Sequence, residues 1–250
     1  VVTPHNAGAP EAVVDVEYMD DGGLVAAVHV GAQSVLRIHN ADGSLEREID
    51  PGALIISNVE TAGSVIAVEA SAPQHPTELF RLDGDSFTRW TQHNPWLSEI
   101  DFGEQRTFRY TARDGQEVEG VLIEPVGGVP AGGAPLILNV HGGPEAHDSN
   151  GWQTAYSKPG HVAAGQGYAV FLPNYRGSTG YGTAFSKQHT GNYTDPEFTD
   201  LVDAKRALVA EGIADPDRVG VTGGSYGGYA TGWSATALSD EFVAGVMFVG

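Results

Sequence analysis

The stretch RVGVTGGSYGGYATGW, from Arg218 to Trp233, decides the fold of this chain. A short apolar run typical of a strand leads to a serine with a glycine pair on each side, and small residues suited to a helix follow. Gly223, Ser225 and Gly227 satisfy G-x-S-x-G, the pattern of the nucleophile elbow, a sharp strand-to-helix turn that lifts a serine hydroxyl above a sheet. Side chains two positions on either side of the serine would collide with the neighbouring strand and helix.

The bare pattern is weak evidence because the chain holds 34 glycines among its 250 residues, so a structural glycine-rich turn is the alternative. The position between an apolar strand and a helix, and the longer string GGSYGGY, favour the elbow. In such a turn the first helical N–H groups point at the space above the serine, where they can hold an oxyanion. Ser225 is therefore the predicted nucleophile.

A second motif agrees with this interpretation. LILNVHGGPEAH places His141, Gly142 and Gly143 directly after an apolar run, as in the oxyanion loop that follows the third strand of hydrolases with this elbow. A tetrahedral intermediate needs two donors, and one would be the N–H of Tyr226, the residue after the serine. The other would be an N–H of the glycine pair. A turn that only requires positive φ is the alternative, and it is compatible with both roles.

The composition excludes several classes of protein. With 41% hydrophobic residues the chain can bury a core, and with no cysteine it forms neither disulfides nor thiolate metal sites. A net charge of −19 argues against nucleic acid as a partner, because phosphate binding requires a basic patch. The acids are scattered, which fits either a salt-adapted surface or an ordinary acidic cytoplasmic protein. No apolar run approaches the roughly 18 residues of a membrane span, and no cofactor loop or metal cluster stands out.

Residues 13–90 have the pattern of short strands separated by turns. Runs such as LVAAVHV are bounded by DDGG, NADG, TAGS and LDGD, which are all turn sequences. GGLVAAVHV recurs as AGSVIAVEA 40 residues later, and IHNADGSLERE recurs as FRLDGDSFTRW 42 residues later. A period of about 40–45 residues with four strands per unit is typical of a β-propeller blade. A plain antiparallel sandwich with coincidental spacing is the alternative.

Beyond a linker at 91–100, strands alternate with helices. The expected strands are a hairpin around Asp114-Gly115, the runs 136–140 and 168–176, RVGVTG before Ser225, and AGVMFVG at 244–250. The expected helices cover 155–166, 198–212 and the residues after Ser225. Such alternation implies right-handed crossovers and a mostly parallel sheet, so the fold class is α/β.

Three motifs in this order and spacing resemble the prolyl oligopeptidase family of serine peptidases: HGGP, PNYRGSTGYG (173–182) and DPDRVGVTGGSYGGY (215–229). The acylaminoacyl-peptidase and dipeptidyl-aminopeptidase branches are the most similar. The resemblance is strong over 135–235, moderate over 101–134 and only architectural before that. It implies the C-terminal blades of an incomplete β-propeller over 1–95 and the N-terminal portion of an incomplete α/β-hydrolase domain over 96–250.

The resemblance also implies roles for single residues. Ser225 would be the nucleophile, and Tyr226 and Gly143 would be the backbone donors of the oxyanion hole. His141 would brace the oxyanion loop. Arg176 matches the motif around it and is expected to have a structural role.

The catalytic base is not evident in the chain. Hydrolases of this fold present Ser, then Asp or Glu, then His, yet all nine histidines precede Ser225, and the acids Asp240 and Glu241 come too early. We therefore expect an internal piece of a longer protein, with the triad Asp and His beyond residue 250 and no activity in the isolated 250-residue segment. His141 as the base is the alternative, but it would sit on the wrong side of the attack.

The leading functional hypothesis is a cytoplasmic serine peptidase acting on short peptides through an acyl-enzyme on Ser225. A carboxylesterase with the same elbow is the runner-up, and a non-enzymatic scaffold is the third. Propeller strands favour the peptidase, because a lid of that kind screens substrates by size. The expectation includes no cofactor, no metal, no nucleic acid and no membrane, and it leaves room for a homo-oligomer.

Overall fold

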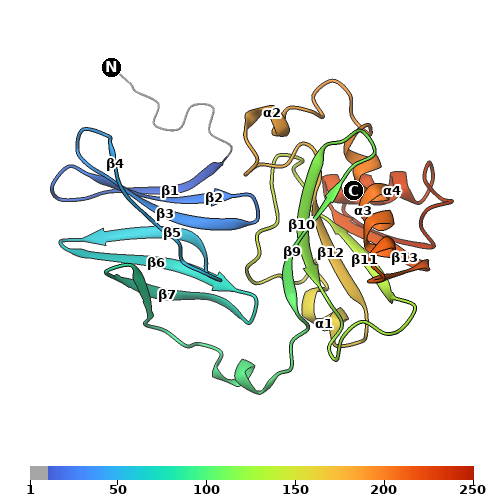
Figure 1. Cartoon of the computed structure of the whole chain (residues 1–250), viewed down its shortest axis with the longest axis horizontal. Helices are drawn as coiled ribbons and strands as arrows, with labels where there is room; N and C mark the ends of the chain where they lie inside the picture. Colours follow the sequence, from blue (N-terminus) through green and yellow to red (C-terminus); the bar gives the residue numbers. More distant parts are fainter. Residues whose placement is uncertain (1–10) are drawn as a thin grey trace. The chain divides into compact units, whose positions relative to one another are not determined.

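Residues 11–250 are described by the computed structural model in Figure 1, and they fall into two units. The first unit runs to Ile100 and includes Ser149–Trp152 and Gly180–Thr183. The second unit comprises Asp101–Asp148, Gln153–Thr179 and Ala184–Gly250.

Two short segments join the first unit although they come from the second half of the sequence. The N–H of Asn150 donates to the carbonyl of Ala32 at 2.7 Å, and the N–H of Gly31 donates to the carbonyl of Gly180 at 2.8 Å. The segments 149–152 and 180–183 are therefore held by the turn between the second and third strands. A single boundary at 95/96 does not anticipate them.

The first unit contains two four-stranded sheets. Each sheet is antiparallel, and its strands are paired in chain order. The strands are β1 (Ala12–Tyr18), β2 (Leu24–Val30), β3 (Gln33–His39) and β4 (Leu45–Ile49), then β5 (Ile55–Ala62), β6 (Val65–Ala72), β7 (His75–Asp83) and β8 (Ser86–Arg89). The expectation of two four-stranded antiparallel units over 13–90 is confirmed.

The sequence echo corresponds to equivalent strands of the two sheets. LVAAVHV forms β2 and SVIAVEA contributes β6, each the second strand of its sheet. The other pair of echoing segments contributes β4 and β8, each the fourth strand. Gly43 and Gly84, in the turns that lead into these last strands, have φ of 86° and 66°, a conformation that favours glycine.

Both sheets of the first unit contribute to one apolar core. In β2, β3 and β6 the core residues are spaced two apart, as expected for side chains on one covered face of a sheet. The buried members are Val25, Ala27, Leu36, Ile38, Ile49, Ile56, Val59, Val68, Ala70 and Phe80.

The second unit is built on a six-stranded mixed sheet with the order β14-β13-β11-β12-β10-β9. Pairing is antiparallel among β9, β10 and β12 and parallel from β12 through β11 and β13 to β14. The strands are β9 (Gln105–Thr111), β10 (Glu117–Ile123), β11 (Ala134–Val140), β12 (Ala169–Asn174), β13 (Ala214–Gly224) and β14 (Ala244–Phe248). The expected mostly parallel α/β arrangement is confirmed from β12 to β14.

The helices are shorter than the sequence pattern suggests. They are the 3-10 helix η1 (Pro95–Glu99), α1 (Gly160–Ala164), α2 (Thr183–Ser186), α3 (Glu197–Ala210) and α4 (Tyr226–Ser234). The helix expected over 155–166 is wrong in extent, because only 160–164 is helical. Pro159 precedes its first residue and Gly160 has a φ of 41°, so the helix has no regular turn on its N-terminal side.

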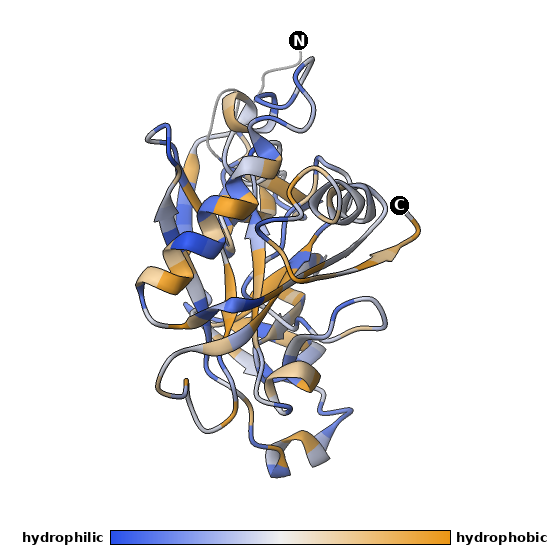
Figure 2. Cartoon of the chain, turned by 90° about the vertical axis from the view of Figure 1, so that its right-hand side faces the viewer, coloured by the Kyte–Doolittle hydropathy of each residue, from blue (hydrophilic) through white to orange (hydrophobic). Residues whose placement is uncertain are grey.

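The core of the second unit lies between the sheet and the helices α3 and α4. Figure 2 shows hydrophobic residues concentrated on the strands of this sheet. Tyr175, Phe171, Phe198, Leu138 and Leu201 are among its largest fully buried side chains. The continuous apolar run of β11 is therefore explained by its central position in the sheet.

Register brings the two predicted catalytic loops together. In the parallel pair of β11 and β13, Val140 lies opposite Gly223. The loop that follows β11 and the turn that follows β13 therefore leave the sheet at the same edge, the carboxyl ends of parallel strands, where α/β proteins place their sites.

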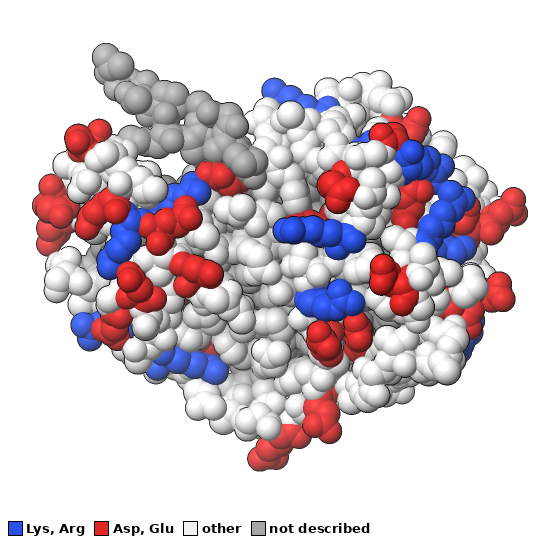
Figure 3. Space-filling view, viewed as in Figure 1, with Lys and Arg blue, Asp and Glu red and all other residues white. Residues whose placement is uncertain are grey.

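Acidic side chains are distributed over the molecular surface. The face shown in Figure 3 carries Asp and Glu over both units, with fewer Lys and Arg among them. The charge balance of the sequence thus gives a broadly acidic surface without a basic stripe on this face.

A buried ion pair joins the segment after β12 to helix α3. Arg176 is 4% exposed and Asp200 is fully buried, and the guanidinium Nη2 lies 2.6 Å from Oδ1 of Asp200. The backbone N–H of Arg176 also donates to Asp200, and Asp114 forms a second ion pair with the guanidinium. The structural role expected of Arg176 fits these contacts.

Replacing Arg176 by methionine is expected to lower the free energy of unfolding by about 3–5 kcal/mol, because the change leaves the carboxylate of Asp200 buried and unpaired. Urea unfolding of the variant measures this loss. Arg176→Met combined with Asp200→Leu should recover part of it, since no uncompensated charge remains. A single variant as stable as the wild type would contradict the assignment.

Candidate active site

Ser225 occupies the turn between β13 and α4. Its φ of 56° and ψ of −119° lie outside the regions that non-glycine residues favour. Such strained conformations persist only where the surrounding structure imposes them, and they gather at functional sites. The backbone geometry agrees with the nucleophile elbow that the sequence predicts.

The glycines on either side of Ser225 are required sterically. A Cβ on Gly223 would collide with the carbonyl oxygen of Val140 and lie 2.7 Å from the backbone of Gly227. A Cβ on Gly227 would collide with the same carbonyl oxygen. The end of β11 therefore lies directly against the turn, and the predicted reason for the two glycines is confirmed.

The glycine pair after β11 lies beside Ser225. A Cβ on Gly142 would be 3.1 Å from Cβ of Ser225 and 3.7 Å from its Oγ. Gly143 has a φ of 127°, and a Cβ there would be 2.6 Å from the N of Glu145. The structure thus places the backbone of Gly142 against the serine and gives Gly143 a conformation that only glycine adopts easily.

His141 is buried under this loop rather than aimed into open space. One ring nitrogen, Nδ1, lies 2.8 Å from the carbonyl oxygen of Gly142, and Nε2 lies 2.9 Å from Oγ of Ser178. The ring stacks on Tyr175 at a centroid distance of 4.4 Å. Burial lowers the pKa of His141, so the neutral form is favoured. These contacts fit a residue that braces the loop better than a residue that accepts a proton from Ser225.

Tyr226 begins helix α4. As the first helical residue, its N–H has no acceptor one turn earlier in the same helix. Its side chain is half-buried among aromatic rings, including those of Tyr175 and Phe198. This position is compatible with the predicted oxyanion role, because N–H groups of a first helical turn are free to bind an anion.

Two further residues near the turn were not singled out from the sequence, although Tyr175 lies within the motif PNYRGSTGYG; Glu197 belongs to no motif. Tyr175 donates a hydrogen bond from its hydroxyl to the carbonyl oxygen of His141 at 2.9 Å. Glu197 accepts a hydrogen bond from the hydroxyl of Tyr226 at 2.7 Å. The sequence analysis missed both because they are distant in the chain from the residues they contact.

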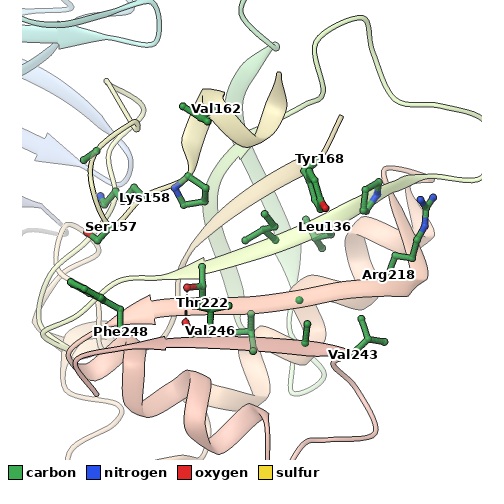
Figure 4. Close-up of a pocket in the computed structure, with 18 of the residues that line it drawn as sticks. Leu136, Ser157, Lys158, Val162, Tyr168, Arg218, Thr222, Val243, Val246 and Phe248 are labelled. Atoms are coloured by element: carbon green, nitrogen blue, oxygen red, sulfur yellow. Dashed lines mark hydrogen bonds between the residues drawn. The ribbon is translucent and has the colours of Figure 1, made fainter. Parts of the chain in front are cut away.

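An apolar groove of about 950 Å³ lies on another part of the second unit. Figure 4 shows its lining side chains, among them Leu136, Thr222, Val246 and Phe248 on the strands and Val162 on α1. Ser225, Tyr226 and the oxyanion loop do not line it. Most of its lining comes from the length of β11, β13 and β14 rather than from their carboxyl ends, so this groove is separate from the candidate active site.

Neither a metal site nor a membrane span is found in the part of the chain that the structure describes. Over 11–250, His, Asp and Glu side chains nowhere gather in groups of three or more that could hold an ion. No helix within these residues has both the length and the apolar character to cross a bilayer.

Comparison with known proteins identifies similar sequences and structures. Residues 154–250 match the sequence profile described as the prolyl oligopeptidase family. Dipeptidyl aminopeptidase BIII of Pseudoxanthomonas mexicana is 33% identical over 210 residues, which are 81% of this chain and 30% of that protein. The uncharacterized peptidase YuxL of Bacillus subtilis is 37% identical over 164 residues, 64% of this chain and 24% of that protein.

The similarity extends to the fold of both units. An acylaminoacyl peptidase of Pyrococcus horikoshii has a TM-score of 0.82 and 28% identity, and the match covers 96% of this chain and 37% of that one. The chain therefore spans about a third or less of the length of the relatives it matches.

The buried His141 gives the protein a pH-dependent stability. Its pKa is lowered in the folded state, whereas the unfolded chain binds a proton near pH 6.5, so its contribution is complete above about pH 6.5 and is lost as the pH falls below that value. We expect the free energy of unfolding to fall more steeply between about pH 7.5 and 5.5 in the wild type than in His141→Gln. Urea unfolding at both pH values tests this, and equal slopes would disprove it.

Proposed function

We propose that this chain, which belongs to the prolyl oligopeptidase family, carries the nucleophile and the oxyanion site of a serine peptidase. The carrying observation is the geometry of Ser225, a non-glycine residue at positive φ with the backbone of Gly142 beside its hydroxyl. The names of the similar proteins, a dipeptidyl aminopeptidase and an acylaminoacyl peptidase, support the same class of activity.

We infer that each of the two units is an incomplete domain of such a peptidase. The second would be the N-terminal portion of an α/β-hydrolase domain, supported by its mixed sheet and by the turn after β13. The first would be two blades of a β-propeller, supported by two four-stranded antiparallel sheets with equivalent echoing strands. A propeller domain in the whole protein would restrict access to short peptides.

The mechanism follows from the elbow. Oγ of Ser225 attacks the carbonyl carbon of the scissile peptide bond, and a histidine base takes the hydroxyl proton. The N–H of Tyr226 and an N–H of the loop containing Gly143 hold the resulting oxyanion. The proton then passes to the leaving amine as the C–N bond breaks, and water hydrolyses the acyl-enzyme. Since every histidine here precedes Ser225 in sequence, the proposal assigns the base and its acid partner to the remainder of the whole protein.

A carboxylesterase is the second candidate, because the same turn and oxyanion donors serve ester substrates. The peptidase is favoured by the similarity of 81% of the chain to a dipeptidyl aminopeptidase, which includes part of the first unit. An esterase would need no such unit to screen peptides by size.

Ser225→Ala in the whole protein is expected to lower kcat/KM for aminoacyl or acyl-aminoacyl anilides by at least about 10³-fold, because removal of a triad nucleophile leaves only the residual rate from oxyanion binding. Circular dichroism should show an intact fold. Fluorophosphonate labelling of the wild type, located by peptide mapping, should fall on Ser225.

Labelling on another residue, or undiminished activity in Ser225→Ala, would overturn the assignment of the nucleophile. Short-chain nitrophenyl esters measured beside the anilides separate the two activities. Efficient hydrolysis of the esters with no hydrolysis of the anilides would favour the carboxylesterase.

Residues 1–250 expressed alone are expected to be inactive toward peptide anilides. No base positioned by this fold after Ser225 is present, so most of the rate enhancement of the triad is lost. Fluorophosphonate labelling of this segment should not exceed that of its Ser225→Ala variant. Hydrolysis of anilides by the segment would show that one of its own residues, His141 included, acts as the base.

A further inference from the structure

The residue after the nucleophile is held by a buried acid. Glu197 is the first residue of α3, and its side chain is fully buried. Its Oε1 accepts two hydrogen bonds, one from the hydroxyl of Tyr226 at 2.7 Å and one from the backbone N–H of Thr194 at 2.5 Å. The first of these bonds joins the first residue of α3 to the first residue of α4, two helices that also contact each other through the ring of Phe198, 5.6 Å from that of Tyr226 between centroids.

The ring of Tyr226 continues this connection to the oxyanion loop. It stacks on Tyr175 at a centroid distance of 6.4 Å and an interplanar angle of 26°. Tyr175 stacks in turn on His141, with ring centroids 4.4 Å apart. Three rings therefore link the turn that carries Ser225 to the loop that follows β11, and Glu197 holds the end of this stack at Tyr226.

Burying the side chain of Glu197 costs free energy, which indicates a role for this residue other than packing. Its Oε2 has no hydrogen-bond partner among the residues that the structure describes, so a buried oxygen remains unsatisfied. Such groups are costly, and each one in a folded protein calls for an explanation. A carboxylate also forms a stronger hydrogen bond with a phenol hydroxyl than a neutral oxygen acceptor does. Burial and then the bond to Glu197 raise the pKa of Tyr226, so its hydroxyl keeps its proton to a higher pH than a free phenol does.

We propose that Glu197 is a positioning residue, which acts through the side chain of Tyr226 to orient the backbone N–H of that residue toward the oxyanion. This rests on the proposed function of Ser225. The side chain and the N–H of Tyr226 share one Cα, and a misplacement of about 1 Å in an active site can cost about 10²-fold in rate. Because the oxyanion exists only in the transition state and the intermediate, the loss falls on kcat rather than on KM.

The test compares variants of the whole protein in two reactions, fluorophosphonate labelling of Ser225 and hydrolysis of a peptide anilide. Tyr226→Phe removes only the hydroxyl, and Glu197→Ala removes its acceptor. Each should lower the labelling rate and kcat by about 10–100-fold, less than or equal to the loss of a whole oxyanion donor, with KM changed less than about twofold. The double variant should lose no more than the worse single variant, because both changes break the same bond.

Two further variants separate positioning from general stability. Glu197→Gln keeps an oxygen acceptor for the phenol and should retain most of the rate. Tyr229→Phe removes the hydroxyl of a neighbouring tyrosine, whose ring centroid lies 5.6 Å from the ring centroid of Tyr226. This control variant should behave as the wild type. Thermal unfolding of every variant shows that the rates refer to folded protein.

The labelling experiment separates a failure of the proposed role of Ser225 from a failure of the proposed role of Glu197. If the wild type is not labelled at Ser225, the proposed function fails and the inference fails with it. If the wild type is labelled and Tyr226→Phe reacts equally fast, Glu197 does not act through this bond and only the inference is overturned. Losses confined to KM, or losses that add in the double variant, would also overturn it.

Discussion

The candidate active site depends on the close approach of the carbonyl of Val140 to the turn after β13. That oxygen occupies the space where both Gly223 and Gly227 would carry a Cβ. Two neighbouring parallel strands therefore end almost in contact, with Val140 opposite Gly223 in register. Ser225 lies between the two glycines with a φ of 56°, and the tight turn imposes this strain on it. A side chain at either glycine would separate the strand ends and move Ser225 away from the loop after β11.

The same approach explains why His141 is buried. The residue follows Val140 immediately, so its side chain leaves the sheet beneath the loop, where it meets Tyr175 and Ser178. Its hydrogen bonds to Ser178 and Gly142 hold the loop, and a Cβ added to Gly142 would lie 3.1 Å from Cβ of Ser225 and 3.7 Å from its Oγ. A histidine in a catalytic motif is thus used here for packing and hydrogen bonding.

Much of this arrangement could be predicted from local sequence, because turns and strand ends have local rules. The glycine turns of the first unit, the hairpin around Gly115 and the elbow at Ser225 each require a backbone conformation that a few adjacent residues specify. Helix α1 could not be predicted in its true extent, because Pro159 and the positive φ of Gly160 restrict it more than apolar periodicity indicates. The contacts of Tyr175 and Glu197 could not be predicted, since their partners are brought to them only by the order of strands in the sheet.

The first turn of α3 shows how that order organises the site. Glu197 and Asp200 are three residues apart, so they lie on the same side of the helix, and both are fully buried. Asp200 binds Arg176, just after β12, whereas Glu197 binds Tyr226, just after β13. Acidic side chains are favoured at this end of a helix by its dipole, which offsets part of the cost of burying them. One helical turn thereby holds the segments that follow two strands of the sheet, and Ser225 belongs to the second of these segments.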